Sequence, residues 1–277
     1  MSELTLRAGE ASASVYPEHG GRLGQLDLGG GPLLRPRSGE GWIDWGCYPL
    51  VPWSNRIPGG HLRWGDIDDQ LPVNSEDGAA IHGLVAACPW TVLDQAESSA
   101  HLEVVVAAGP YRIRAAQTFD LEPDRLGLQL SAENEGEVPV PVGIGIHPWF
   151  HRGRVQLAAE ERWPGEPIPT GPPVPVEGRY DLRQGVVPAP MDACFTTLTA
   201  PVAEVPGARL RWDGPISNVV VYTGEPDWVC VEPVTMATNG FELARAGAPH
   251  HGVQVLEPGA AIEVGYRFER ANLQPPR

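Results

Sequence analysis

A carboxylate at the end of an apolar run is the first group in this chain whose setting suggests chemistry. Glu232 follows the run at residues 228–231 and is itself followed by Pro233. If the run is a buried strand, an ionised carboxylate there costs free energy unless it is paired, hydrogen-bonded or functional. Glu232 is therefore a candidate general base. The alternative is a structural salt bridge to one of the 20 basic residues, all of which are arginine.

Two histidines could supply the acid that complements such a base. The small apolar residues 143–146 deliver His147 at the end of a strand, where Pro148 prevents the ladder from continuing. His82 precedes Gly83, which permits a close backbone approach, although a lone histidine in such a place is more often a hydrogen-bonded core residue. A glutamate and a histidine on opposite sides of a sugar ring could act as base and acid with neither cofactor nor metal.

A metal site is the rival interpretation of His147 and His151. In an extended chain, four residues span about 13 Å, too far for one ion with bonds of about 2 Å, and Pro148 argues against a helical turn. His250 and His251 would point to opposite faces of a strand, which is typical of a surface loop. We therefore expect no metal and no cofactor.

Groups that could hold a sugar lie close to these candidates in the sequence. Arg56, next to Asn55, could bind a hydroxyl or a carboxylate with its planar fork, although a loop arginine more often caps backbone carbonyls. The neighbouring aromatic residues are Trp53, Trp90, Trp149 and Trp228. Apolar ring faces beside hydrogen-bonding groups suit a pyranose, which has C–H patches as well as hydroxyls.

The segments that must position these residues have the pattern of half-buried strands. Apolar side chains recur with a period of two at residues 102–106, 113–121, 126–130 and 262–268. Turn signals separate the runs, and residues 62–71, with Gly65 and Asp66 near the middle, are a hairpin candidate. No long window has helical periodicity. The pattern predicts an all-β sandwich or barrel of antiparallel strands.

One stretch, residues 160–190, is rich in proline, glycine and arginine and could be mistaken for a linker between domains. We expect a long surface loop instead, because the strands at 219–222 and 228–231 need partners that the first part of the chain can supply. The chain is thus expected to form a single domain.

Composition excludes several classes of protein. The absence of lysine rules out Schiff-base aldolases, pyridoxal-phosphate enzymes and Walker-type phosphate loops. A net charge of -15 disfavours nucleic acid and anionic membranes as partners. The four cysteines form no C-x-x-C pair and no secretory signal begins the chain, so we expect reduced thiols in the cytoplasm.

Five motifs in this order resemble the aldose 1-epimerase (mutarotase) family. They lie at residues 46–57 (GCYPLVPWSNRI), 81–83 (IHG), 147–150 (HPWF), 191–195 (MDACF) and 230–233 (CVEP). The resemblance implies a large antiparallel β-sandwich, here one domain over residues 1–277, with the active site in a cleft on its concave face.

The resemblance also implies roles for individual residues. Glu232 matches the base that takes the proton of the anomeric hydroxyl, and His147 matches the acid that protonates the ring oxygen. His82 matches a second histidine that hydrogen-bonds near that oxygen. Arg56 and Asp192 match residues that hold sugar hydroxyls. For this chemistry His147 must carry a proton while Glu232 is ionised, and a nearby carboxylate favours the charged imidazole.

The segment around the motif at residues 147–150 differs at two positions from that of the galactose-processing members. Ile146 stands where these usually have Asn before the histidine, and Trp149 stands where they have Tyr. The acid and base remain, while the identity of the sugar stays open. The chain looks more like compact bacterial members without an assigned substrate.

The sequence therefore predicts a cofactor-free mutarotase that binds a small-molecule sugar, a free aldohexose, as a monomer or homodimer. Asn55 and Trp149 join Arg56 and Asp192 as expected substrate-binding residues. A hexose-6-phosphate mutarotase is the first alternative, with Arg152 and Arg154 as its cationic cluster. A catalytically silent carbohydrate-binding module is the second, although such a module has no need of both an acid and a base.

Overall fold

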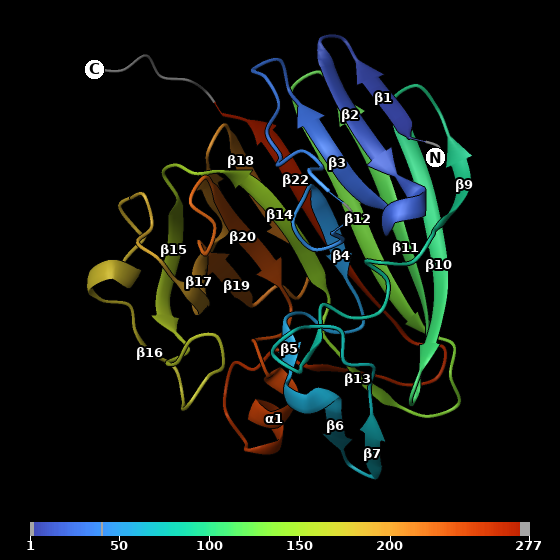
Figure 1. The fold of residues 1–277 in the computed structure, drawn as a ribbon, viewed down its shortest axis with the longest axis vertical. Helices are drawn as coiled ribbons and strands as arrows, with labels where there is room; N and C mark the ends of the chain where they lie inside the picture. Colours follow the sequence, from blue (N-terminus) through green and yellow to red (C-terminus); the bar gives the residue numbers. More distant parts are fainter. Residues whose placement is uncertain (1–2, 40, 272–277) are drawn as a thin grey trace.

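The computed structural model describes residues 3–39 and 41–271, and most of its regular elements are strands (Figure 1). In chain order the strands are β1 (Leu4–Ala8), β2 (Ala11–Tyr16), β3 (Arg22–Asp27), β4 (Cys47–Leu50), β5 (Arg56–Ile57), β6 (His61–Trp64), β7 (Ile67–Gln70), β8 (Ala80–Ile81), β9 (Thr91–Gln95), β10 (Ser99–Ala108), β11 (Tyr111–Glu122), β12 (Arg125–Asn134), β13 (Val140–Val142), β14 (Gly145–His151), β15 (Gln156–Arg162), β16 (Val174–Pro175), β17 (Asp192–Val205), β18 (Ala208–Asp213), β19 (Asn218–Tyr222), β20 (Trp228–Val234), β21 (Gln254–Leu256) and β22 (Ala261–Arg270). The helical elements are the short 3-10 turns η1 (Pro17–His19), η2 (Pro58–Gly60) and η3 (Gly178–Tyr180) and the helix α1 (Gly240–Arg245). The predicted all-β class is confirmed.

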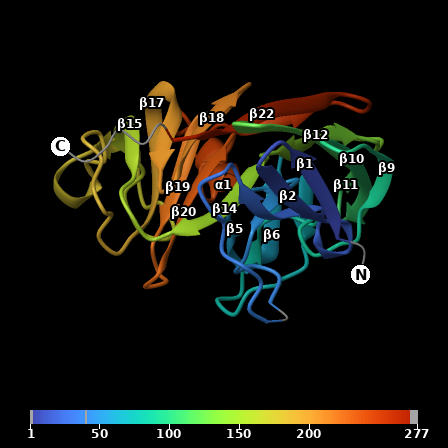
Figure 2. The same cartoon turned by 90° about the horizontal axis from the view of Figure 1, so that it is seen from above.

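A single sixteen-stranded sheet contains most of these strands. Its order is β1-β2-β3-β4-β14-β20-β19-β17-β18-β22-β12-β11-β10-β9, with β15 and β16 attached beside β17, and its pairs are antiparallel. The two ends of the sheet face each other, because β1 and β2 contact β11 (Figure 2). The last strand, β22, lies between β18 and β12 and so joins the two halves. The predicted antiparallel sandwich is therefore one long sheet folded over itself.

The period-two pattern decides which face of each strand is buried. In β11 the side chains of Ile113, Ala115, Gln117, Phe119 and Leu121 are buried, while those that alternate with them are partly or fully exposed. Strand β12 follows in register, so that Phe119 lies opposite Leu128. Because alternate side chains point to opposite faces, this alternation puts an apolar layer inside the fold and polar groups in water.

The hairpin and the long loop predicted from the sequence are also present. Strands β6 and β7 pair across Gly65 and Asp66, and Gly65 has the positive φ of 55° that the turn requires. Residues 163–191 form an irregular excursion that contains only β16 and η3. Strand β20 pairs with β14, so the first part of the chain does supply a partner. Helix α1 has six residues, too few for its periodicity to be detected.

A buried arginine fastens the segment that precedes β4. Arg22, at the start of β3, is fully buried, and its guanidinium donates hydrogen bonds to the carbonyls of His19, Trp42, Trp45 and Ala86 at 2.6–3.0 Å. Burial lowers its pKa to about 10, so it remains a cation at neutral pH. The charge lies over the rings of Trp45 and Tyr48, 4.3 and 4.9 Å from their centroids. Arg22 thus holds together backbone from three separate segments.

We expect Arg22→Lys to lower the free energy of unfolding by about 3 kcal/mol, because an ammonium cannot reproduce the planar fork and leaves buried carbonyls unpaired. Urea denaturation measures the change. Arg125→Lys is the control, since Arg125 forms an exposed ion pair with Glu122 and its replacement should leave the midpoint unchanged. Equal midpoints for both variants would contradict the role given to Arg22.

Candidate active site

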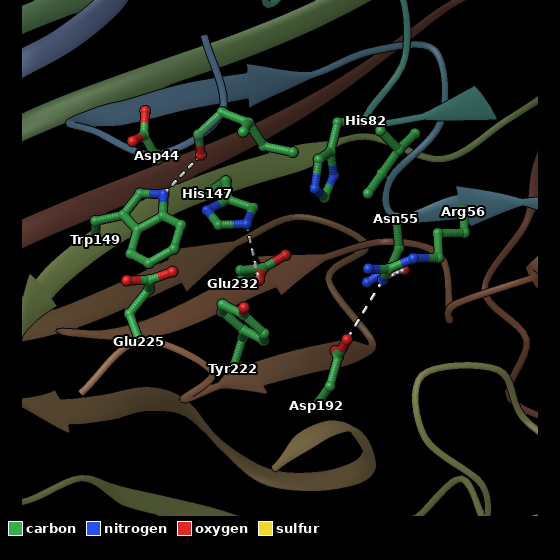
Figure 3. Close-up of a pocket in the computed structure, with 12 residues that line it drawn as sticks. Asp44, Asn55, Arg56, His82, His147, Trp149, Asp192, Tyr222, Glu225 and Glu232 are labelled. Atoms are coloured by element: carbon green, nitrogen blue, oxygen red, sulfur yellow. Dashed lines mark hydrogen bonds and ion pairs between the residues drawn. The ribbon is translucent and has the colours of Figure 1, made fainter. Parts of the chain in front are cut away.

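A cavity of about 170 Å³ opens on one face of the sheet, where four neighbouring strands contribute side chains (Figure 3). Strands β14, β20, β19 and β17 form its floor, and the segments around β5 and β8 close one side. The lining residues are Ile43, Asp44, Asn55, Arg56, Ile81, His82, His147, Trp149, Asp192, Tyr222, Glu225 and Glu232. All seven residues predicted to form the site are among them.

Strand register brings the predicted acid and base together. In the pairing of β14 with β20, Gly145 lies opposite Val234 and Trp149 opposite Cys230, so His147 lies opposite Glu232. His147 Nε2 and Glu232 Oε1 are 3.2 Å apart, and the two side chains are 5% and 2% exposed. The expectation that they lie on opposite sides of a sugar ring is wrong in this structure, because this separation leaves no room for a ring between them.

Aromatic rings fix the orientation of His147. Tyr48, on the neighbouring strand β4, stacks on the imidazole with centroids 4.7 Å apart and an interplanar angle of 14°. His82 meets it edge-on at 4.9 Å, and Trp149 lies 5.5 Å away on its own strand. The Trp149 N–H is bonded to the carbonyl of Ile43 at 2.9 Å, so the indole presents an apolar surface to the cavity. The histidine is held on three sides.

His82 reaches the cavity from a strained turn. Its φ is 60° and that of Gly83 is 76°, and its N–H donates to the carbonyl of Asn55 at 2.9 Å. A Cβ on residue 83 would lie 2.0 Å from the carbonyl oxygen of Val51, so only glycine fits. The close approach predicted for Gly83 is therefore confirmed, and it places the His82 ring beside that of His147.

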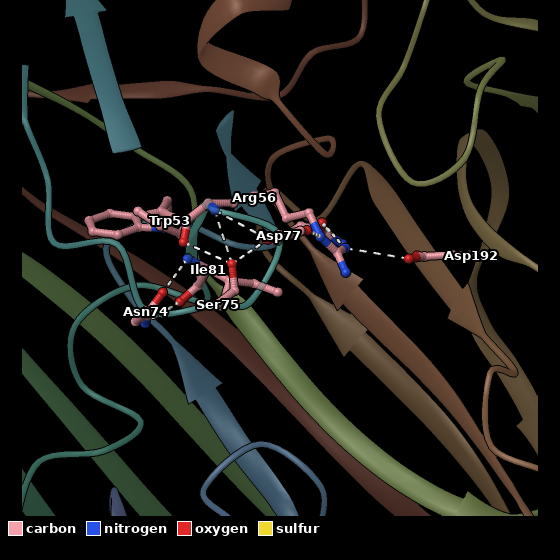
Figure 4. Close-up of polar contacts among 10 residues, drawn as sticks. Trp53, Arg56, Asn74, Ser75, Asp77, Ile81 and Asp192 are labelled. Carbon is pink, nitrogen blue, oxygen red and sulfur yellow. Dashed lines mark hydrogen bonds and ion pairs between the residues drawn. The ribbon is translucent and has the colours of Figure 1, made fainter. Parts of the chain in front are cut away.

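Arg56 has the structural role that the sequence left open, and it also lines the cavity. Its Nε donates to Asp77 at 2.9 Å, and its Nη1 donates to Asn55 Oδ1 at 3.1 Å and to Asp192 at 3.4 Å (Figure 4). Asp77 belongs to a loop that internal hydrogen bonds hold in place. The Ser75 hydroxyl donates to the Asp77 carboxylate, and the side-chain amide of Asn74 donates to the carbonyl and accepts from the N–H of Ile81. The guanidinium thus bridges this loop to β17 while it lines the cavity.

Burial controls the protonation of the His147–Glu232 pair. It lowers the pKa of His147 to about 3 and raises the pKa of Glu232 well above its ordinary value, with a smaller contribution from Asp192. The pair by itself therefore favours one proton on Glu232 and a neutral imidazole. The expectation that the carboxylate keeps His147 charged is wrong, because desolvation of two buried charges outweighs their attraction.

Unpartnered polar atoms point to a ligand. His82 Nδ1, His147 Nδ1 and Glu232 Oε2 are buried and have no hydrogen-bond partner within the described residues. Such groups are rare in native proteins because each costs free energy. Three of them on the lining of one cavity indicate a site whose hydrogen bonds are completed by a bound molecule.

Other residues that the sequence singled out lie elsewhere. Trp53 and Trp90 are buried in the core, and neither they nor Trp228 line the cavity. His151 is exposed and stacks on Trp228 at 4.4 Å, apart from His147. His250 and His251 lie in a loop after α1, as predicted.

Sequence reasoning missed five residues of the site. Tyr48 was part of a motif but had no role, and Tyr222 ends a run that was read only as a strand. Ile43, Asp44 and Glu225 lie in loops rich in glycine, tryptophan or proline, where no periodicity marks them. Only the packing of distant loops around the strand ends shows their place.

The architecture and the site together define the class of protein. The chain matches the aldose 1-epimerase family over residues 2–269 and belongs to it. Within residues 3–39 and 41–271, no helix has the length and apolar character needed to cross a membrane.

Relatives agree with this assignment. A structure from Escherichia coli K12, provisionally named an aldose 1-epimerase, is similar with a TM-score of 0.84 and 26% identity over 97% of this chain and 98% of that one. A galactose mutarotase-like protein from Clostridium acetobutylicum shares the fold with a TM-score of 0.80 and 21% identity over 97% and 95%. The E. coli protein YphB, described as uncharacterized, is 35% identical over 137 residues, 48% of this chain. The matched region spans about half (47%) the length of that relative.

We expect Glu232→Gln to stabilise the folded protein at neutral pH. The pKa of Glu232 is raised in the folded state, so its carboxyl stays protonated there while the unfolded chain ionises above its ordinary pKa of 4.5. Stability is therefore lost as pH rises above 4.5, and glutamine, which cannot ionise, removes that loss. Urea denaturation should show that the free energy of unfolding of the variant exceeds that of the unsubstituted protein by more at pH 7 than at pH 4. An advantage independent of pH would contradict the protonation assigned to Glu232.

Proposed function

We propose that this protein is a cofactor-free mutarotase that interconverts the α and β anomers of a free aldohexose such as glucose or galactose. The observation that carries the proposal is the buried His147–Glu232 pair, 3.2 Å apart, on the floor of a cavity of about 170 Å³. A binding module needs no proton-transfer pair, so this pair supports an enzyme over the non-catalytic alternative.

The short separation suits the atoms that must exchange protons. The anomeric hydroxyl oxygen O1 and the ring oxygen O5 are both bonded to C1, so a base at one and an acid at the other must be neighbours. Glu232 takes the O1 proton while His147 protonates O5. The C1–O5 bond breaks with its electron pair going to O5, and O1 becomes the carbonyl oxygen of an open aldehyde. Rotation about C1–C2 and reclosure, with the roles exchanged, give the other anomer.

The reactive form differs from the resting form only in the position of one proton. In the resting form Glu232 carries it, whereas ring opening requires it on His147. Transfer across the 3.2 Å contact leaves the net charge of the pair unchanged. Sugar hydroxyls that donate to Glu232 Oε2, which lacks a partner, would stabilise the carboxylate and so promote the transfer.

The remaining lining residues would hold the sugar. Arg56 and Asp192 offer a donor and an acceptor for hydroxyls, with Asn55 beside them, and Trp149 offers an apolar face for the C–H side of the ring. His82 lies close enough to His147 to bond near the ring oxygen. These roles follow those expected from the family motifs.

The charge of the cavity favours an uncharged substrate over a hexose 6-phosphate. Asp44, Asp192 and Glu225 line it, whereas Arg56 is already bonded to two aspartates. The proposed phosphate cluster is engaged elsewhere: Arg152 donates to the carbonyl of Pro188 and Arg154 to that of Gln184.

The first test is polarimetry or NMR of freshly dissolved α-glucose and α-galactose. We expect the protein to accelerate equilibration, and Glu232→Gln and His147→Asn each to reduce kcat about 100-fold or more, because each removes a proton-transfer group. His151→Asn, four residues away and outside the cavity, is the matched control and should retain full activity. Failure to accelerate any aldohexose above the buffer rate would refute the proposal.

The second test concerns the charge of the substrate. We expect kcat/KM to be at least about 10-fold lower for glucose 6-phosphate than for glucose, because a dianion is repelled by carboxylates at the cavity. Glu225→Gln should reduce the difference in kcat/KM between glucose and glucose 6-phosphate. Added salt should reduce the same difference in the unsubstituted protein. Glu242→Gln, which changes the charge on α1 away from the cavity, is the control. A preference for the phosphate would favour the alternative.

A further inference from the structure

A third potential ligand lies against the proposed acid–base pair. Cys230 precedes Glu232 by two residues on β20, so both side chains lie on the same face of the sheet. One ligand atom each from His147, Cys230 and Glu232 lies within 4.8 Å of the others, and all three residues are buried. The mutarotase chemistry proposed above gives Cys230 no role.

We propose that His147, Cys230 and Glu232 form a binding site for a thiophilic divalent cation of the zinc type, and that a bound cation blocks the proton-transfer pair. The inhibitory part rests on the proposed function, whereas the binding part does not.

The donor set selects the class of metal. Imidazole nitrogen, thiolate and carboxylate are ligands of zinc and its heavier relatives, whereas magnesium and calcium take oxygen ligands. Ligand atoms around a tetrahedral zinc ion lie about 3.5 Å apart, given bonds of roughly 2.0–2.3 Å. The His147–Glu232 distance of 3.2 Å already fits, and Cys230 requires a shift of about 1.3 Å at most, the difference between 4.8 Å and the tetrahedral separation of about 3.5 Å.

An unpartnered polar atom supports occupancy by a cation. Glu232 Oε2 is buried, belongs to a residue that lines the cavity and has no hydrogen-bond partner among the described residues. A divalent cation that replaces the protons of the Cys230 thiol and the Glu232 carboxyl leaves a thiolate, a carboxylate and the metal with no net formal charge, which a buried site tolerates far better than free anions.

Binding and catalysis exclude each other at this place. The cation would bind His147 Nε2 and the Glu232 carboxylate, the groups that must exchange protons with the sugar. Three protein ligands leave the fourth position of a tetrahedral ion open toward the cavity. A sugar and the cation therefore compete for the same space.

The binding test uses Cd²⁺, whose thiolate complexes absorb in the ultraviolet, on protein treated with chelator and a non-thiol reductant. We expect one Cd²⁺ per chain, displaced by Zn²⁺, and retained in Cys88→Ala, since Cys88 is the half-buried thiol outside the site. Cys230→Ala should abolish the band, and Glu232→Gln should weaken binding at least about 10-fold. Circular dichroism confirms that each variant is folded. An ultraviolet band that persists in Cys230→Ala, or that disappears in Cys88→Ala, would overturn the proposed site. The absence of binding at a tenfold excess of Cd²⁺ over protein would do the same.

The inhibition test measures sugar equilibration with and without Zn²⁺. Zn²⁺ should slow equilibration by the unsubstituted protein and by Cys88→Ala, and chelator should restore both rates. The factor by which Zn²⁺ slows Cys230→Ala should be at least about 10-fold smaller. Zinc that binds without slowing turnover would overturn the inhibitory part. If the protein equilibrates no sugar, the proposed function fails, while the cadmium band still decides whether the site exists.

Discussion

The burial of His147 against Glu232 is the constraint on which the site depends. Two ionisable groups in so dry a place must share a single proton, and the surrounding structure keeps them in contact. The pairing of β14 with β20 sets their alignment, Tyr48 stacks on the imidazole, and Arg22 holds the segment that carries Tyr48. A shift of one residue between β14 and β20 would turn one partner to the opposite face.

Local patterns were sufficient to predict the strands and the hairpin at residues 62–71. They also marked His82, His147 and Glu232 as polar residues at positions where the strand pattern calls for apolar ones. The period-two alternation of β11 and β12 depends on neighbours in the sequence, so it can be read directly. The family motifs added Asp192, whose sequence context alone would not have marked it. These predictions succeeded because each rested on a short segment.

What the sequence could not show arises from contacts between distant segments. The proximity of Glu232 to His147 depends on a register between strands about 85 residues apart, and the stacking of Tyr48 depends on a third strand. The predicted charge on His147 is wrong because the sequence shows that a carboxylate and an imidazole could attract each other, whereas it does not show how deeply both are buried. Trp53 and Trp90 lie in irregular segments and pack in the core, and Trp228 lies against His151 at the start of β20, so nearness to the polar motifs in the sequence did not place these rings in the cavity.

The position of β22 has a consequence for how the protein is made. This strand, residues 261–270, lies between β12 and β18, so the sheet has a gap at its middle until these residues have left the ribosome. Both halves then wait with unpaired strand edges while synthesis continues, and the final joining needs contacts across more than a hundred residues. Such contacts form slowly, and open edges attract other chains. The sheet is therefore closed only after residues 261–270 have been synthesised, and the interval before that is when the nascent chain is most exposed to aggregation.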